Sequence, residues 1–75
     1  MQYDHLIDIK GLCCSAPIIL LTKKLKNFSA KEIILIISDK SSMLKDIPAY
    51  CAMTNHELIK QEHANNIYHF WLRKQ

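Results

Sequence analysis

The alternation of hydrophobic and polar positions changes its period along the chain, and each change predicts a new element. In residues 3–9, YDHLIDI, the apolar Leu6 and Ile7 stand among polar positions and Gly11 interrupts the segment, so we expect a strand there. Residues 32–38, EIILIIS, are continuously apolar and β-branched, which is typical of a strand in the middle of a sheet. The first half of the chain is therefore predicted to supply two strands.

Helical spacing begins at Ser15, between these two strands. The apolar positions there recur at i, i+3, i+7 and i+10, which places them on one face of a helix: Ile18, Leu21, Leu25 and Phe28. Ser15 is a suitable N-cap, and Pro17 falls in the first turn, where its missing N–H removes no helical hydrogen bond. A helix is therefore expected from this point.

A second helix must accommodate Pro48. With Asp46 as its N-cap, this proline would occupy the second helical position, where it is tolerated. The helix would then run to about Thr54, with Asn55 near its end. The expected start of this helix thus follows from the proline.

The last third of the chain predicts a β-hairpin, with residues 56–63 and 67–74 on either side of an Asn-containing turn. Its second strand places Tyr68, Phe70 and Leu72 on one side, and Ile67, His69 and Trp71 on the other. The order is βαβαββ. It predicts one α/β two-layer sandwich domain over residues 1–75, with two helices packed on one face of a four-stranded mixed sheet.

Composition narrows the class of protein without deciding it. Apolar residues make up 49% of the chain and charged residues 23%, which fits a globular domain. The longest apolar runs, 17–21 and 33–37, are far shorter than the roughly 20 residues that a membrane span needs. The first residues lack signal-peptide character, so we expect a cytoplasmic protein with reduced thiols. The net charge is only +3, and the lysines at 23, 24 and 26 are interpreted as a solvated helix face.

Metal and cofactor chemistry finds little support in the residue spacing. The cysteines at 13 and 14 are adjacent instead of forming a C-x2-C pair, and the histidines at 5, 56, 63 and 69 are scattered. A chain with one glycine has no Gly-rich phosphate loop. We therefore expect neither a metal site nor a bound cofactor.

The two thiols before the first helix are the strongest chemical signal. A cysteine there would face unpaired backbone N–H groups and the positive end of the helix dipole, which favour the thiolate. Of the pair, Cys14 is nearer to the helix, so we expect it to be the more reactive; the alternative is that both are small buried hydrophobic residues. We expect Cys51, Met43 and Met53 to pack in the core.

Residues 7–25, IDIKGLCCSAPIILLTKKL, resemble the opening of the TusA/SirA-like family of small sulfur carriers, whose signature contains an Asp, a Gly-Leu-x-Cys-Pro-x-Pro core and an amphipathic helix. The matching residues are Asp8, Gly11, Leu12, Cys14 and Pro17. Residues 32–59 resemble the same family's next strand, its Asp-Ile-Pro helix and the His-Glu-Leu that follows. The resemblance covers about residues 6–74, with its pieces in the family's order.

The resemblance implies the βαβαββ sandwich and a chemistry. In the family, the signature cysteine, here Cys14, accepts sulfane sulfur as a persulfide from a cysteine desulfurase or another donor and passes it to an acceptor protein. The TusA branch serves 2-thiouridine formation in tRNA, and other members serve different sulfur pathways. The implied partners are therefore a persulfide donor and a sulfur acceptor. From the short apolar runs and the net charge of only +3 we expect no membrane partner and do not favour direct nucleic-acid binding.

Two departures from the signature leave alternatives open. Ser15 replaces the first proline, which motivates a non-catalytic regulatory or protein-interaction module with the same fold. Cys13 could attack a Cys14 persulfide and release sulfide, or it could point away into the core, which is the interpretation we favour. A third hypothesis, a small RNA-binding domain, rests on the basic helix and on Tyr68, Phe70 and Trp71 as sheet aromatics.

Overall fold

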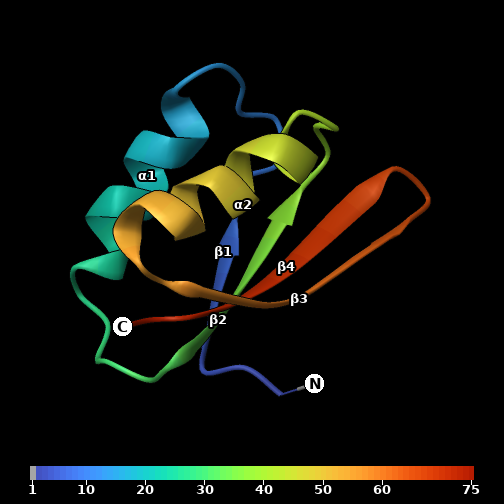
Figure 1. Ribbon diagram of the computed structural model, residues 1–75. Coiled ribbons are helices and arrows are strands. Elements are labelled where there is room, and N and C mark those ends of the chain that lie inside the picture. The colour runs from blue at the N-terminus through green and yellow to red at the C-terminus, as the bar shows by residue number, and fades with distance from the viewer. Residues whose placement is uncertain (1) are drawn as a thin grey trace.

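Both helices lie on one face of a four-stranded sheet in the computed structural model, which describes residues 2–75 (Figure 1). The elements follow in the order β1 (His5–Asp8), α1 (Ala16–Leu25), β2 (Ile33–Ser38), α2 (Met43–Thr54), β3 (Glu57–Ala64) and β4 (Ile67–Arg73). The predicted βαβαββ two-layer α/β sandwich is confirmed.

The sheet has the strand order β1-β2-β4-β3, so β2 is an inner strand as its Ile-rich sequence predicted. β1 pairs with β2 in parallel, with Ile7 beside Ile36, and the other two pairings are antiparallel. The parallel pair requires a crossover connection, which α1 provides. The carboxyl ends of β1 and β2 therefore meet at one edge, from which the loops leading to both helices emerge (Figure 1).

The hydrophobic core fills the space between the sheet and the helices. Its members come from three strands and two helices, namely β1 with the residue just after it, β2, β4, α1 and α2: Ile7, Ile9, Leu21, Leu25, Ile34, Ile36, Met43, Ile47, Tyr50, Cys51, Tyr68, Phe70 and Leu72. The expected burial of Cys51 and Met43 is confirmed. Met53 was expected in the core but is 75% exposed, because it falls on the outer side of α2.

The predicted start of α2 at Asp46 is wrong. The helix begins at Met43 with Ser42 as its N-cap residue, and the Asp46 N–H donates to the Ser42 carbonyl at 3.0 Å. Pro48 therefore lies inside the helix and deprives the Leu44 carbonyl of its intrahelical partner. The apolar stripe explains the earlier start, because a helix from Met43 buries that residue together with Ile47, one turn further on. The predicted end is confirmed, with α2 closing at Thr54.

The C-terminal hairpin turns through two residues with positive φ, Asn65 (53°) and Asn66 (63°). Positive φ at both central positions defines a type I′ turn, which matches the twist of the flanking strands. The predicted alternation in β4 is confirmed, since Phe70 is fully buried beneath the helices. On the opposite sheet face, Trp71 is only 7% exposed, and the Lys60 ammonium lies 5.4 Å from its ring centroid.

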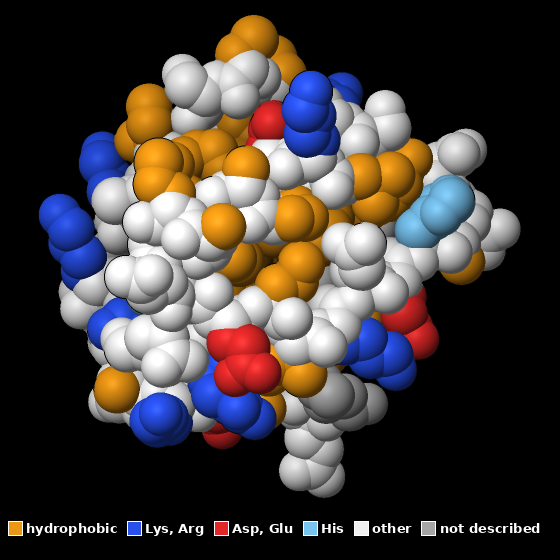
Figure 2. Space-filling view, viewed as in Figure 1, with side chains coloured by type: hydrophobic (Ala, Val, Ile, Leu, Met, Phe, Trp, Pro, Cys, Tyr) orange, Lys and Arg blue, Asp and Glu red, His pale blue; other side chains and the backbone are white. Residues whose placement is uncertain are grey.

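The helix-bearing surface is not uniformly polar. Figure 2 shows hydrophobic side chains in the middle of this face, with Lys and Arg side chains around its rim. Ile19 on α1 and Leu44 on α2 are 51% and 42% exposed. Neither helix within residues 2–75 has the length and apolar character that a bilayer crossing requires.

A polar cluster joins the start of β1 to the start of β2. His5 stacks on Phe28 with ring centroids 3.8 Å apart, and its Nε2 is hydrogen-bonded to Glu32 Oε1 at 2.9 Å. The same oxygen accepts the Ser29 N–H at 2.7 Å. The hydrogen bond to His5, followed by that from Ser29, lowers the pKa of Glu32 below its ordinary value.

We expect Glu32→Gln to make the free energy of unfolding less dependent on pH in the acidic range. The Glu32 pKa is lower in the folded chain than in the unfolded one, so its contribution is complete above the unfolded pKa and is lost as the pH falls through the folded pKa. Denaturant titrations at a series of acidic pH values measure this. His5→Ala should give part of the change, because the Ser29 N–H remains. An identical acid side in wild type and Glu32→Gln would contradict the assignment.

Candidate functional site

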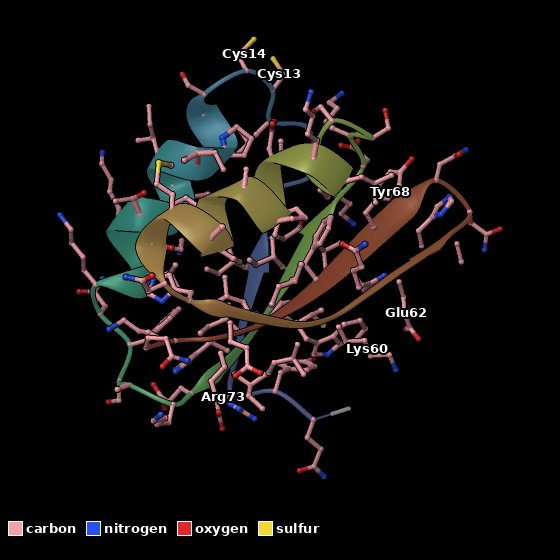
Figure 3. The ribbon with its side chains drawn as sticks, viewed as in Figure 1. Cys13, Cys14, Lys60, Glu62, Tyr68 and Arg73 are labelled. Atoms are coloured by element: carbon pink, nitrogen blue, oxygen red, sulfur yellow. The ribbon has the colours of Figure 1, made fainter. Side chains whose placement is uncertain are left out.

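Cys13 and Cys14 lie in the loop between β1 and α1, at the edge where β1 and β2 end. Figure 3 shows both side chains at this end of the molecule, with their sulfur atoms pointing outward into solvent. Both residues are exposed and neither is in a disulfide. The favoured expectation that Cys13 points into the core is therefore wrong, and so is the alternative that the pair is buried.

The loop that carries the two cysteines is held by a hydrogen bond between a residue that follows β1 and a residue that follows β2. Gly11 has φ +83° and its N–H donates to Asp39 Oδ1 at 3.1 Å, directly after β2. This backbone hydrogen bond is the main reason that the pKa of Asp39 lies below its ordinary value. The Leu12 N–H donates to the Ile9 carbonyl at 3.2 Å and completes the turn. Gly11 therefore turns the chain after the first strand, at the residue where the sequence pattern predicted an interruption.

The backbone at Cys14 is in an unusual conformation for a residue with a side chain. Its φ is +62°, in the left-handed region that favours glycine. The turn is closed by the Ala16 N–H, which donates to the Cys13 carbonyl at 3.3 Å. Strained conformations of this kind concentrate at functional sites, where the surrounding structure holds them. The bend presents both thiols on the outer side of the loop.

The first helical turn follows as expected, with one difference. Ser15 is the N-cap residue of α1, but its side chain makes no capping hydrogen bond. Pro17 is the second helical residue and is buried against the core, where it anchors the start of the helix. The Ile19 N–H donates to the Ser15 carbonyl at 3.1 Å. The position of Ser15 is confirmed, whereas side-chain capping is not observed.

The two sulfur atoms are neighbours. Cys14 Sγ donates a hydrogen bond to Cys13 Sγ across 3.7 Å, and no backbone N–H within residues 2–75 donates to either sulfur. This hydrogen bond, together with repulsion from an ionised Cys13, raises the pKa of Cys14 above its ordinary value. The expected lowering by the helix dipole is therefore wrong, because the side chain points away from the helix end.

The remaining candidate ligands and nucleophiles lie elsewhere. Cys51 is 3% exposed, and burial raises its pKa to about 11, so it remains an inert thiol in the core. Within residues 2–75, no three His, Cys, Asp or Glu side chains come together in a metal-binding arrangement. The chemistry available at the site is thus that of two adjacent, solvent-facing thiols.

Asp39 is a residue of this site that sequence reasoning did not find. It contributes to the loop geometry by binding the Gly11 N–H, although it lies 28 residues further along the chain. A signal was present, because Asp39 directly follows the strand EIILIIS and the parallel pairing brings that end beside the end of β1. Connecting the two required knowledge of which strands are neighbours.

The two-layer α/β sandwich, with Cys14 exposed just before the start of α1, is the arrangement implied by the resemblance to the small TusA/SirA-like sulfur carriers. A family model described as "Sulfurtransferase TusA" matches residues 5–74. The chain is also similar to "Sulfur carrier protein TusA" of Buchnera aphidicola subsp. Baizongia pistaciae (strain Bp), with 37% identity over 71 residues, covering 95% of this chain and 90% of that protein. The chain therefore belongs to the TusA sulfur-carrier family, as its motifs predicted.

Gly11→Ala should lower the free energy of unfolding by about 1–2 kcal/mol, because alanine is disfavoured at positive φ. No heavy atom lies within 4 Å of the added Cβ, so the change in the free energy of unfolding reports on the backbone conformation and not on a steric clash. Urea denaturation measures the change. Lys10→Ala, in the same loop but without positive φ, is the control and should stay within about 0.5 kcal/mol of wild type. A Gly11→Ala protein as stable as wild type would contradict the observed turn.

Cys13→Ala should lower the pKa of Cys14, because it removes both the sulfur that accepts the Cys14 hydrogen bond and the repulsion from a second ionised thiol. The measurement is the rate of Cys14 alkylation against pH, assigned residue by residue by mass spectrometry. Cys13→Ser should give a smaller shift, since its hydroxyl can still accept the hydrogen bond. An unchanged or higher Cys14 pKa in Cys13→Ala would refute the coupling.

Proposed function

We propose that this protein carries sulfane sulfur as a persulfide on Cys14 and passes it to an acceptor protein. The observation that supports this role most directly is that the family's signature cysteine is an exposed thiol in a bend with positive φ. A donor can approach this sulfur from solvent without any rearrangement of the core. Cys51, the third thiol, offers no such access.

The proposed loading step is a thiol exchange. The Cys14 thiolate attacks the outer sulfur of a donor persulfide, the donor's S–S bond breaks, and the donor cysteine leaves as a thiolate. The product is a Cys14 persulfide, and no external oxidant or reductant is consumed. Delivery repeats the exchange, with an acceptor thiolate attacking the outer sulfur of Cys14. The donor class is a cysteine desulfurase or another persulfide protein.

The pKa of Cys14 affects the first step. Because Cys13 raises this pKa, the thiolate fraction at neutral pH is small, and loading should accelerate as the pH rises toward the pKa. A donor that removes the Cys14 proton would have the same effect. We place the exchange in the cytoplasm, where thiols remain reduced, with tRNA 2-thiouridine formation or another sulfur-transfer pathway as its destination.

The structure argues against one of the two alternative functions, and an experiment must separate the other from the carrier function. The RNA-binding hypothesis rested on the basic helix and on sheet aromatics, but Tyr68 and Phe70 are 8% and 0% exposed, and the Lys60 ammonium lies over the ring of Trp71, which is 7% exposed. These rings are not available for base stacking. The interaction-module hypothesis, motivated by Ser15, is separated from the carrier by whether Cys14 takes up sulfur.

Cys14→Ser should abolish sulfur loading, because a serine hydroxyl does not form a persulfide. The purified protein is incubated with a cysteine desulfurase and cysteine, and the added sulfur is located by intact and peptide mass spectrometry. Cys13→Ser should still load on Cys14, and Cys51 should stay unmodified in every variant. Undiminished loading of Cys14→Ser would overturn the assignment, and failure of every donor to load Cys14 in both wild type and Cys13→Ser would favour the interaction module.

A further inference from the structure

We propose that Cys13 discharges the Cys14 persulfide, releasing its outer sulfur as hydrosulfide and leaving a disulfide between the two neighbouring cysteines. The inference rests on the proposed loading of Cys14 and adds a second outcome to it, since sulfur can then leave this protein as free hydrosulfide as well as by transfer to an acceptor thiol. It assigns Cys13 the role of a resolving nucleophile.

The position of the two sulfur atoms supports this role. At 3.7 Å, Cys13 Sγ and Cys14 Sγ are in contact, and the Cys14 thiol already donates its hydrogen bond to Cys13. Both side chains are exposed, so neither must leave the core before reaction. Persulfidation removes the hydrogen that Cys14 donates. Rotation about the Cys14 Cβ–Sγ bond then turns the outer sulfur away from Cys13, so that a lone pair of Cys13 Sγ faces Cys14 Sγ.

The geometry also distinguishes the two sulfur atoms of the persulfide. Thiolates attack along the line of the S–S bond, opposite the leaving sulfur. If Cys13 attacked the outer sulfur, the three sulfur atoms would have to lie in a line within the ring formed by the two side chains and the backbone between them. A ring that joins two adjacent residues is too small for this linear arrangement. Attack on Cys14 Sγ places the leaving sulfur outside the ring. We therefore assign the inner sulfur, Cys14 Sγ, as the atom attacked.

The step is balanced in atoms and electrons. The Cys13 thiolate forms a bond to Cys14 Sγ, the bond from Cys14 Sγ to the outer sulfur breaks, and the outer sulfur leaves as HS⁻ with the electron pair. The sulfane sulfur is reduced to sulfide while the two cysteine sulfurs are oxidised to a disulfide. A dithiol reductant, either a protein of the thioredoxin class or a small dithiol, then restores both thiols.

The disulfide formed by discharge should be short-lived when such a dithiol is present. Adjacent Cα atoms are about 3.8 Å apart, whereas disulfides usually join Cα atoms separated by about 4.4–6.8 Å. The resulting strain makes this bond easier to reduce than an ordinary structural disulfide. The exposure of both sulfurs gives the reductant access. Discharge can therefore recur instead of trapping the protein in an oxidised form.

The experiment loads reduced full-length protein with inorganic polysulfide, removes the excess without added thiol, and follows hydrosulfide release with a fluorescent bimane trap. Wild type should release hydrosulfide at least about tenfold faster than Cys13→Ser, because its nucleophile is held in contact with the persulfide. Intact mass should show wild-type product lighter than the reduced protein by two hydrogen atoms. Cys13→Ser should instead retain its persulfide.

Ser15→Ala is the matched control, because it changes the other neighbour of Cys14 and leaves both thiols in place; it should discharge like wild type. Cys13→Ala provides a second variant without the nucleophile, and circular dichroism checks that each variant is folded. Equal release from wild type and Cys13→Ser would overturn the inference, as would sulfur found on Cys13 without hydrosulfide, or a Cys14 that polysulfide does not load. A desulfurase that fails to load Cys13→Ser would count against the carrier function alone, since polysulfide loading does not depend on a donor protein.

Discussion

The parallel pairing of β1 with β2 is the constraint on which the rest of the structure depends. The pairing places the buried Ile7 of β1 beside the buried Ile36 of β2, and it requires the chain to return through a crossover helix on the face that these side chains make apolar. It also brings the ends of both strands together, so that Asp39 can hold the Gly11 N–H. The thiol loop is thus fixed by the same pairing that organises the core.

The chemistry of the loop depends on side-chain direction more than on proximity to the helix. Cys14 directly precedes the N-cap of α1, yet its sulfur points outward. It donates a hydrogen bond to Cys13 Sγ and accepts none from the N–H groups at the start of the helix. The helix dipole acts strongly only within its first turn and along its axis. In this protein the adjacent thiol, and not the helix, determines the direction in which the pKa of Cys14 is shifted.

Much of the fold could be predicted from the sequence because its signals are periodic. The Ile-rich β2, the apolar face of α1 and the alternation in β4 each bury the expected residues. The start of α2 could not be predicted from Pro48 alone, because packing of Met43 and Ile47 outweighs the lost hydrogen bond.

The site was predictable to a lesser extent. The motif pointed to Cys14, and the single glycine marked the turn before it. The contact between the two sulfurs depends on a positive φ at Cys14, a position where most residues avoid that conformation, so no propensity or spacing indicates it. The role of Asp39 depends on strand neighbours that lie far apart in the sequence.

The burial of Trp71 has a practical consequence. It is the single tryptophan of the chain, and it lies on the sheet face opposite the helices, beside Leu35 of β2 and beneath Lys60. Its emission spectrum therefore responds to separation of the inner strands, while the cysteine loop occupies the strand-end edge of the molecule. One optical signal can monitor the integrity of the sheet throughout a sulfur-exchange reaction, independently of the probes that follow the thiols.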